Sequence, residues 1–178
     1  ALVAARRVGG RGRIGLAQTF LAHAHYLGGT SAEARPLLES ALIMAEEMGS
    51  GGWSSHLHVL SGLVALEVGE AEEARWSLER ALSALPPNAH PVETTSTFYD
   101  LLGGWPTSWL DLLEARLALD RGEHATSRQA LARVLEHVLV RHHKPLLLEA
   151  LAVWAEWCVR TDRPFSADRM ASMLLACS

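Results

Sequence analysis

The chain has 178 residues, of which 49% are hydrophobic and 6% aromatic, and its formal net charge is −4. The large apolar share excludes disorder as the default state, and the acidic balance argues against a surface that follows nucleic-acid phosphates. The two cysteines form no CxxC pair, and no apolar run reaches the roughly 20 residues of a membrane span, so we expect a cytoplasmic protein that binds neither membrane nor nucleic acid.

Apolar residues recur along the chain at steps of three and four, the spacing that places them on one face of an α-helix. One such stripe is Ala34, Leu38, Ala41, Leu42 and Ala45. No alternating strand pattern accompanies these stripes, so the sequence predicts an all-α fold without β-strands. In chain order, helices are expected near residues 1–8, 14–27, 31–48, 53–68, 71–85, 108–121, 125–141, 145–160 and 165–177.

The predicted helices repeat in pairs, and each pair is joined by a turn of one kind. Glycine or aspartate stands at the turn, a small residue lies seven positions before it, and alanine or serine lies five positions after it. Small residues let two antiparallel helices approach closely, so each pair is predicted to form a tight hairpin that buries its bulkier stripe on the next pair. The four copies have turns at Gly29, Gly69, Gly122 and Asp162, preceded by Ala22, Gly62, Ala115 and Ala155 and followed by Ala34, Ala74, Ser127 and Ala167.

The spacing of the copies breaks once. Corresponding residues of the first two copies, and of the last two, are 40 positions apart, whereas Ala74 and Ser127 are separated by 53. The additional residues fall within 86–107, a stretch that contains several prolines and glycines and has room for a short extra helix at 92–102. We interpret 86–107 either as a long connector or as a functional flap over a groove.

At these small, glycine and alanine positions the chain resembles the tetratricopeptide repeat (TPR) family, and Pro86 falls where that family often ends a repeat. The unit is longer than the family's usual length of about 34 residues. Segments such as 38–49 are similar to the long-helix variant in the C-terminal repeat region of large bacterial ATP-binding transcriptional regulators, of the LuxR-like and maltose-activator-like kind. The resemblance implies a superhelical array of about four antiparallel helix hairpins over residues 1–178, a TPR-like solenoid. Ser127, Val134 and Asp162 depart from the pattern, so the third and fourth hairpins are expected to be less regular.

The chain begins and ends inside predicted helices, and we therefore expect it to be a fragment of a longer protein. A solenoid buries each hairpin only against its neighbours, so a fragment exposes the apolar stripe of its terminal units. The helix at 167–178, with Met170 and Leu174, is accordingly expected to form a homodimer by symmetric packing.

The motifs that would indicate a cofactor or a metal lack the context they need. The segment from Gly10 to Gly15 satisfies GxGxxG, but a dinucleotide turn requires strands before and after it, so we expect a loop between two hairpins instead. His23 with His25, and His56 with His58, are two positions apart, whereas metal-binding pairs on a helix use a spacing of three or four. HExxH, a P-loop, GxSxG and a cysteine nucleophile signature are absent, so we expect no metal, no cofactor and no enzyme activity.

The concave wall of such a solenoid is the remaining candidate site, because the first helix of each hairpin lines it. A mixture of aromatic, histidine and charged side chains suits an extended peptide or a polar small effector, with Arg116 holding a carboxylate between the apolar walls of Tyr26 and Trp109. An unoccupied, solvated face is the alternative. The residues that the repeat phase places there are Thr19, His23, Tyr26, His56, Val59, Leu63, Trp109, Leu112, Arg116, Glu149, Glu156 and Arg160.

We therefore expect a non-catalytic module that binds a protein, a peptide or a small effector, and that serves as the sensory or interaction domain of a bacterial transcriptional regulator. Binding in the groove would shift the array, and any attached domain, between two states. One alternative is a constitutive protein-assembly scaffold, which would show no conformational response to a small molecule. The other is a small helical enzyme, which would need polar catalytic groups that converge in one pocket.

Overall fold

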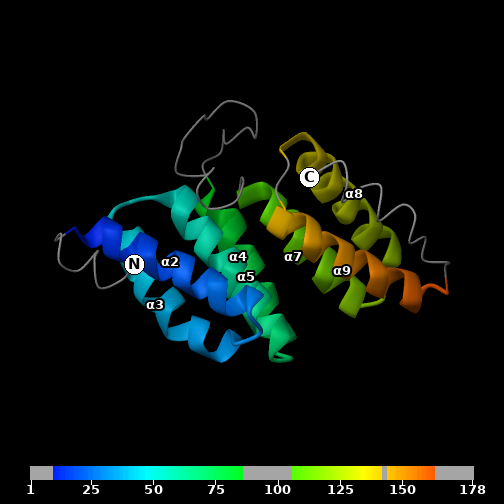
Figure 1. The fold of residues 1–178 in the computed structure, drawn as a ribbon, viewed down its shortest axis with the longest axis horizontal. Coiled ribbons are helices and arrows are strands. Elements are labelled where there is room, and N and C mark those ends of the chain that lie inside the picture. The colour runs from blue at the N-terminus through cyan, green and yellow to red at the C-terminus, as the bar shows by residue number, and fades with distance from the viewer. Residues whose placement is uncertain (1–9, 86–105, 142–143, 163–178) are drawn as a thin grey trace. The chain divides into compact units, whose positions relative to one another are not determined.

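A computed structural model describes residues 10–85, 106–141 and 144–162, without the side chains of Pro106 and residues 139–141 (Figure 1). Over these ranges the chain is helical and contains no β-strand, which confirms the all-α prediction there. The predicted helices at 1–8 and 165–177, the short helix at 92–102 and the expected dimer contact through 167–178 lie outside the described residues, as does most of the 86–107 connector. The helices are α2 (Arg11–Leu27), α3 (Ser31–Glu47), α4 (Gly51–Glu67), α5 (Ala71–Ala84), α7 (Pro106–Asp120), α8 (His124–Arg141) and α9 (Lys144–Arg160).

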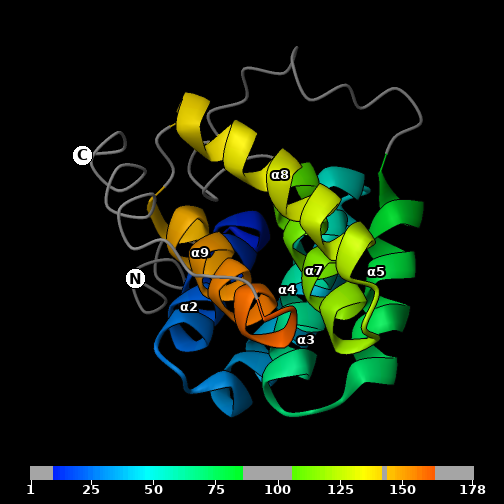
Figure 2. The same ribbon diagram turned by 90° about the vertical axis from the view of Figure 1, so that its right-hand side faces the viewer.

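The chain forms two compact units, Ala1–His90 and Pro91–Ser178. In the first unit, α2 packs on α3 and α4 packs on α5, so two helical hairpins are present, and α3 and α2 both contact α4. In the second unit, α7 packs on α8, and α9 contacts both of them (Figure 2). The prediction that the hairpins form one continuous TPR-like array over residues 1–178 stays a prediction.

The turns of the hairpins explain why glycine recurs in the sequence. Gly29, Gly69 and Gly122 have φ angles of 71°, 81° and 73°, a left-handed conformation that glycine adopts without steric cost. At the first of these turns the Thr30 amide donates to the His25 carbonyl at 2.9 Å, and the second and third turns repeat this bond, which closes the end of the preceding helix. Asp162, at φ 51°, takes the same left-handed conformation although it is not glycine.

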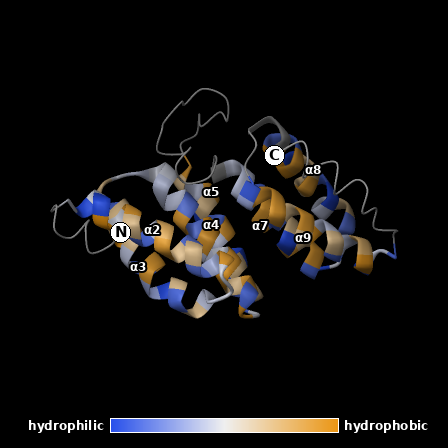
Figure 3. Ribbon diagram, viewed as in Figure 1, coloured by the Kyte–Doolittle hydropathy of each residue, from blue (hydrophilic) through white to orange (hydrophobic). Residues whose placement is uncertain are grey.

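The predicted stripes form much of the buried core. On α3 the alanines of the stripe and Leu38 are buried, and on α8 the equivalent positions, from Ser127 to Val138, are mostly buried as well. The bulkier leucines of the stripe are not buried: Leu42 of α3 is partly exposed, and Leu82 of α5 is 56% exposed. Both hydrophilic and hydrophobic residues occur along each of these second helices, as expected for helices that bury one side only (Figure 3).

Close packing between α2 and α4 joins the two hairpins of the first unit. Gly15 of α2 is buried beside Trp53 of α4, and a Cβ atom at Gly15 would lie 2.4 Å from Cη2 of that ring. The Trp53 indole N–H donates to the Thr19 hydroxyl oxygen at 3.0 Å. The expectation that residues 10–15 form a loop is therefore wrong, because α2 begins at Arg11 and its glycine makes room for a tryptophan.

Candidate functional site

Most of the site residues predicted in the first unit are buried. Thr19, Tyr26, His56, Val59 and Leu63 are each 4% exposed or less, so the expectation that these side chains line an open groove is wrong. The physical reason is that α2 packs on α3, and α4 contacts α2, α3 and α5, so neighbouring helices cover the faces that the repeat phase assigned to the inner wall.

The structure does bring three of the predicted residues of the first unit together. The ring of His23, which is half-buried, lies 6.4 Å from the Tyr26 ring and 6.2 Å from the His56 ring, centroid to centroid. The Thr19 hydroxyl donates to the Gly15 carbonyl at 2.9 Å while it accepts from Trp53. These contacts hold two helices together within a core.

The predicted residues of the second unit fall into two groups. Trp109 and Leu112 are buried in the core, which again contradicts an open position, whereas Arg116 and Glu149 are half-buried. Exposed Arg160 pairs with Glu156 at 2.5 Å, and it also donates to the carbonyl of Leu119 at 2.7 Å and to the Asp120 carboxylate at 3.1 Å.

Arg160 and Glu156 therefore fasten α9 to the end of α7. A shared surface of His23, Tyr26, Trp109 and Arg116 would span the two units. Buried Tyr26 and Trp109 form no open part of it; the rest of that surface, and ligand binding by the predicted residues that are not buried, stay predictions.

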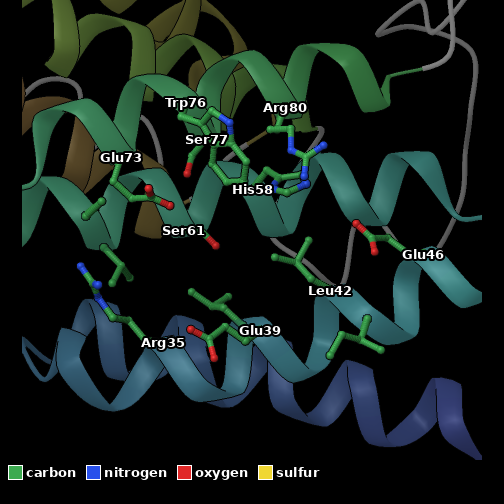
Figure 4. A pocket seen from close by; sticks show the side chains of 14 residues that line it. Arg35, Glu39, Leu42, Glu46, His58, Ser61, Glu73, Trp76, Ser77 and Arg80 are labelled. Atoms are coloured by element: carbon green, nitrogen blue, oxygen red, sulfur yellow. The ribbon is translucent and has the colours of Figure 1, made fainter.

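A cavity in the first unit lies elsewhere, between α3 and α5, with α4 as its floor (Figure 4). We call it the α3–α5 groove; its volume is about 350 Å³. None of the twelve predicted site residues lines it. Its lining residues are Arg35, Leu38, Glu39, Leu42, Ile43 and Glu46 of α3, His58, Ser61, Val64 and Ala65 of α4, and Glu73, Trp76, Ser77 and Arg80 of α5.

Two large apolar side chains of the α3–α5 groove face solvent. Ile43 is 58% exposed and Trp76 is 47% exposed. The Arg80 guanidinium lies 4.6 Å from the centroid of the Trp76 ring, and the His58 ring meets Trp76 edge-on at 6.4 Å. These two contacts favour one orientation of the indole, which lowers the entropic cost of presenting its apolar surface.

The charged groups of the groove are three glutamates and two arginines. Among the described residues, Glu39, Glu46 and Glu73 form no ion pair, whereas Arg35 is paired with Glu70. Burial lowers the pKa of His58 below its usual value, the positive charge of Arg80 lowers it further, and the Glu46 carboxylate acts in the opposite direction. His58 is therefore neutral at neutral pH, and the three carboxylates outweigh the single unpaired arginine of the groove, Arg80.

Sequence reasoning missed this groove because it followed the residues that repeat. Ile43 and Trp76 are large apolar residues that interrupt the repeat, since the equivalent positions in the other copy hold Ser83 and Pro36. A search for apolar residues that break the repeat would have found the groove.

Metal sites and membrane-spanning helices are the two other features that the described part of the chain allows us to assess. Over residues 10–85, 106–141 and 144–162, no group of three or more His, Cys, Asp and Glu side chains is arranged to hold a metal ion. None of the helices described there has the length and apolar character needed to cross a membrane. Comparisons with protein-family models, with curated proteins and with solved structures found no match.

Proposed function

We propose that this chain is a non-catalytic helical-hairpin module that binds an α-helical segment of a partner protein in the α3–α5 groove. The observation that carries the proposal is the pair of exposed apolar side chains, Ile43 and Trp76, on either side of a cavity whose floor combines apolar Val64 and Ala65 with polar His58 and Ser61. Exposed aromatic residues with a fixed orientation are typical anchors of protein interfaces, because little conformational entropy is lost when they bind.

A helix fits the groove better than an irregular segment does. The lining of α3 extends from Arg35 to Glu46, which corresponds to a length of about 16 Å, or three turns, on an α-helix. A helix laid along α3 and α5 would place an apolar ridge between them, which is the usual way in which helices pack. The acidic rim adds a charge that a basic partner complements.

The resemblance noted in the sequence gives this binding a context. In a TPR-like array within a bacterial transcriptional regulator, a bound helix would favour one arrangement of the hairpins and so influence an attached domain in the cytoplasm. A constitutive scaffold would bind its partner in the same groove without that response. A polar small effector is the competing occupant.

Selection from a library of displayed peptides of about five helical turns, with this chain as the target, tests the proposal. Selected peptides should bind with a Kd that Trp76→Ala raises about tenfold or more, because a central aromatic anchor is lost. Leu82→Ala is the matched control, since Leu82 is a similarly exposed apolar residue of α5 that does not line the groove.

A selection that yields no binders, or binders that tolerate Trp76→Ala as well as they tolerate Leu82→Ala, would overturn the proposal. Binding of peptides without helical character in the complex, measured by circular dichroism, would show that the occupant is not a helix.

A further inference from the structure

We infer that the helix bound in the α3–α5 groove carries two basic residues seven positions apart, one for Glu39 and one for Glu46, with an apolar side chain between them. This inference rests on the proposed function and specifies the chemistry of its partner. The argument comes from the spacing, the lack of ion pairs and the apolar surface between the two carboxylates.

Spacing is the first step. Glu39 and Glu46 lie two turns apart on α3, so both point to one side of the helix, and both line the groove (Figure 4). Seven residues of helix correspond to a rise of about 10.5 Å. A second helix packed alongside α3 has the same rise, so its residues at positions i and i+7 come opposite the two carboxylates.

The pattern of ion pairs on α3 is the second step. The acidic residues of α3 outside the groove both have a cationic or titratable neighbour, since Glu47 pairs with Arg11 at 2.6 Å and Glu33 lies 3.9 Å from the His25 ring. Glu39 and Glu46, within the groove, form no ion pair in the described structure, and His58, the titratable group on which Glu46 acts, has a lowered pKa. The carboxylates that no internal cation neutralises are therefore the ones that a partner can reach.

The apolar surface between the carboxylates is the third step. Leu42 and Ile43 follow Glu39 by three and four positions, so they lie on the same side of α3, midway between the two charges. Trp76 stands on the opposite wall, with Arg80 already stacked on its ring. A partner cation near Trp76 would meet that arginine, so the partner's apolar side chain belongs at Trp76 and its basic residues belong on the α3 side.

Three synthetic helical peptides of about five turns test the inference. The first carries leucines on one face, flanked by lysines seven positions apart; the second replaces those lysines with glutamates; the third keeps the lysine spacing but moves the lysines to the face opposite the leucines. We expect the first to bind most tightly, and more weakly as the salt concentration rises. The double variant Glu39→Gln/Glu46→Gln should weaken its binding about 3- to 10-fold, because exposed ion pairs each contribute little.

Glu79→Gln is the matched control, since Glu79 is exposed on α5, forms no ion pair in the described structure and does not line the groove. Circular dichroism of each variant checks that the helices are intact. Glu79→Gln should leave the binding of the first peptide unchanged.

Equal binding of the first two peptides, or of the first and third, would overturn the inference. Equal effects of Glu79→Gln and the double variant would do so as well. If selected peptides still lose binding on Trp76→Ala in those cases, the groove remains a helix site and only its charge preference is wrong. If neither the synthetic nor the displayed peptides bind in a manner that depends on Trp76, the proposed function fails together with the inference.

Discussion

Replacement of Gly15 by alanine tests the packing between the two hairpins of the first unit. The added Cβ would lie 2.4 Å from Cη2 and 2.9 Å from Cζ2 of Trp53. Trp53 is buried, and its indole N–H is bonded to Thr19, so the ring cannot move aside without losing that hydrogen bond. Gly15→Ala therefore forces two helices apart or displaces a buried ring.

The magnitude follows from three contributions. Overpacking of a core costs about 1–3 kcal/mol. Loss of the hydrogen bond between Trp53 and Thr19 destabilises the folded state by about 1 kcal/mol. The higher helix propensity of alanine stabilises it by about 1 kcal/mol. Gly15→Ala should thus lower the free energy of unfolding by about 1–3 kcal/mol.

Gly12 provides the matched control on the same helix. A Cβ at Gly12 would lie 3.3 Å from Cε at the flexible end of the exposed Met48 side chain, which can move aside. Gly12→Ala should therefore raise the free energy of unfolding by up to about 1 kcal/mol. Urea unfolding, followed by far-ultraviolet circular dichroism, compares both variants with the parent chain. If Gly15→Ala proves as stable as Gly12→Ala, Trp53 does not occupy the space beside Gly15 and the described packing of α2 on α4 is wrong.

Two further predictions concern the first unit. Burial, and then the charge of Arg80, lower the pKa of His58 below 6.5, so the unfolded chain takes up a proton before the folded chain does, and the free energy of unfolding should fall as the pH drops below that value. In His58→Gln this fall, measured by urea unfolding at several pH values, should be smaller. An equal fall in the variant and the parent chain would contradict this prediction. Ala74 is fully buried at the start of α5, so Ala74→Leu should cost about 1–3 kcal/mol by overpacking. The exposed Ala71 on the same turn is its control, and equal thermal unfolding of Ala74→Leu and Ala71→Leu would show that Ala74 does not face a neighbouring helix.

The sequence by itself determined the helices and the turns, because both depend on local properties. Apolar spacing of three and four residues predicted α3 and α5 to within a residue or two of their observed ends. The recurrent glycine marked turns that require a left-handed residue, and Asp162 adopts the same conformation because aspartate tolerates it better than most residues do. The same periodicity identified Ala34, Leu38 and their equivalents as core.

Only the tertiary structure decided which surfaces remain open. Burial of Thr19, Tyr26 and His56 depends on how closely α2 approaches α4, and that distance is set by Gly15 and Trp53, which are 38 positions apart in the sequence. The α3–α5 groove likewise exists only because three helices meet around it. A periodic pattern states which residues share a face of one helix, but exposure of that face is a property of its neighbours, so the sequence could predict the hairpins and not the site between them.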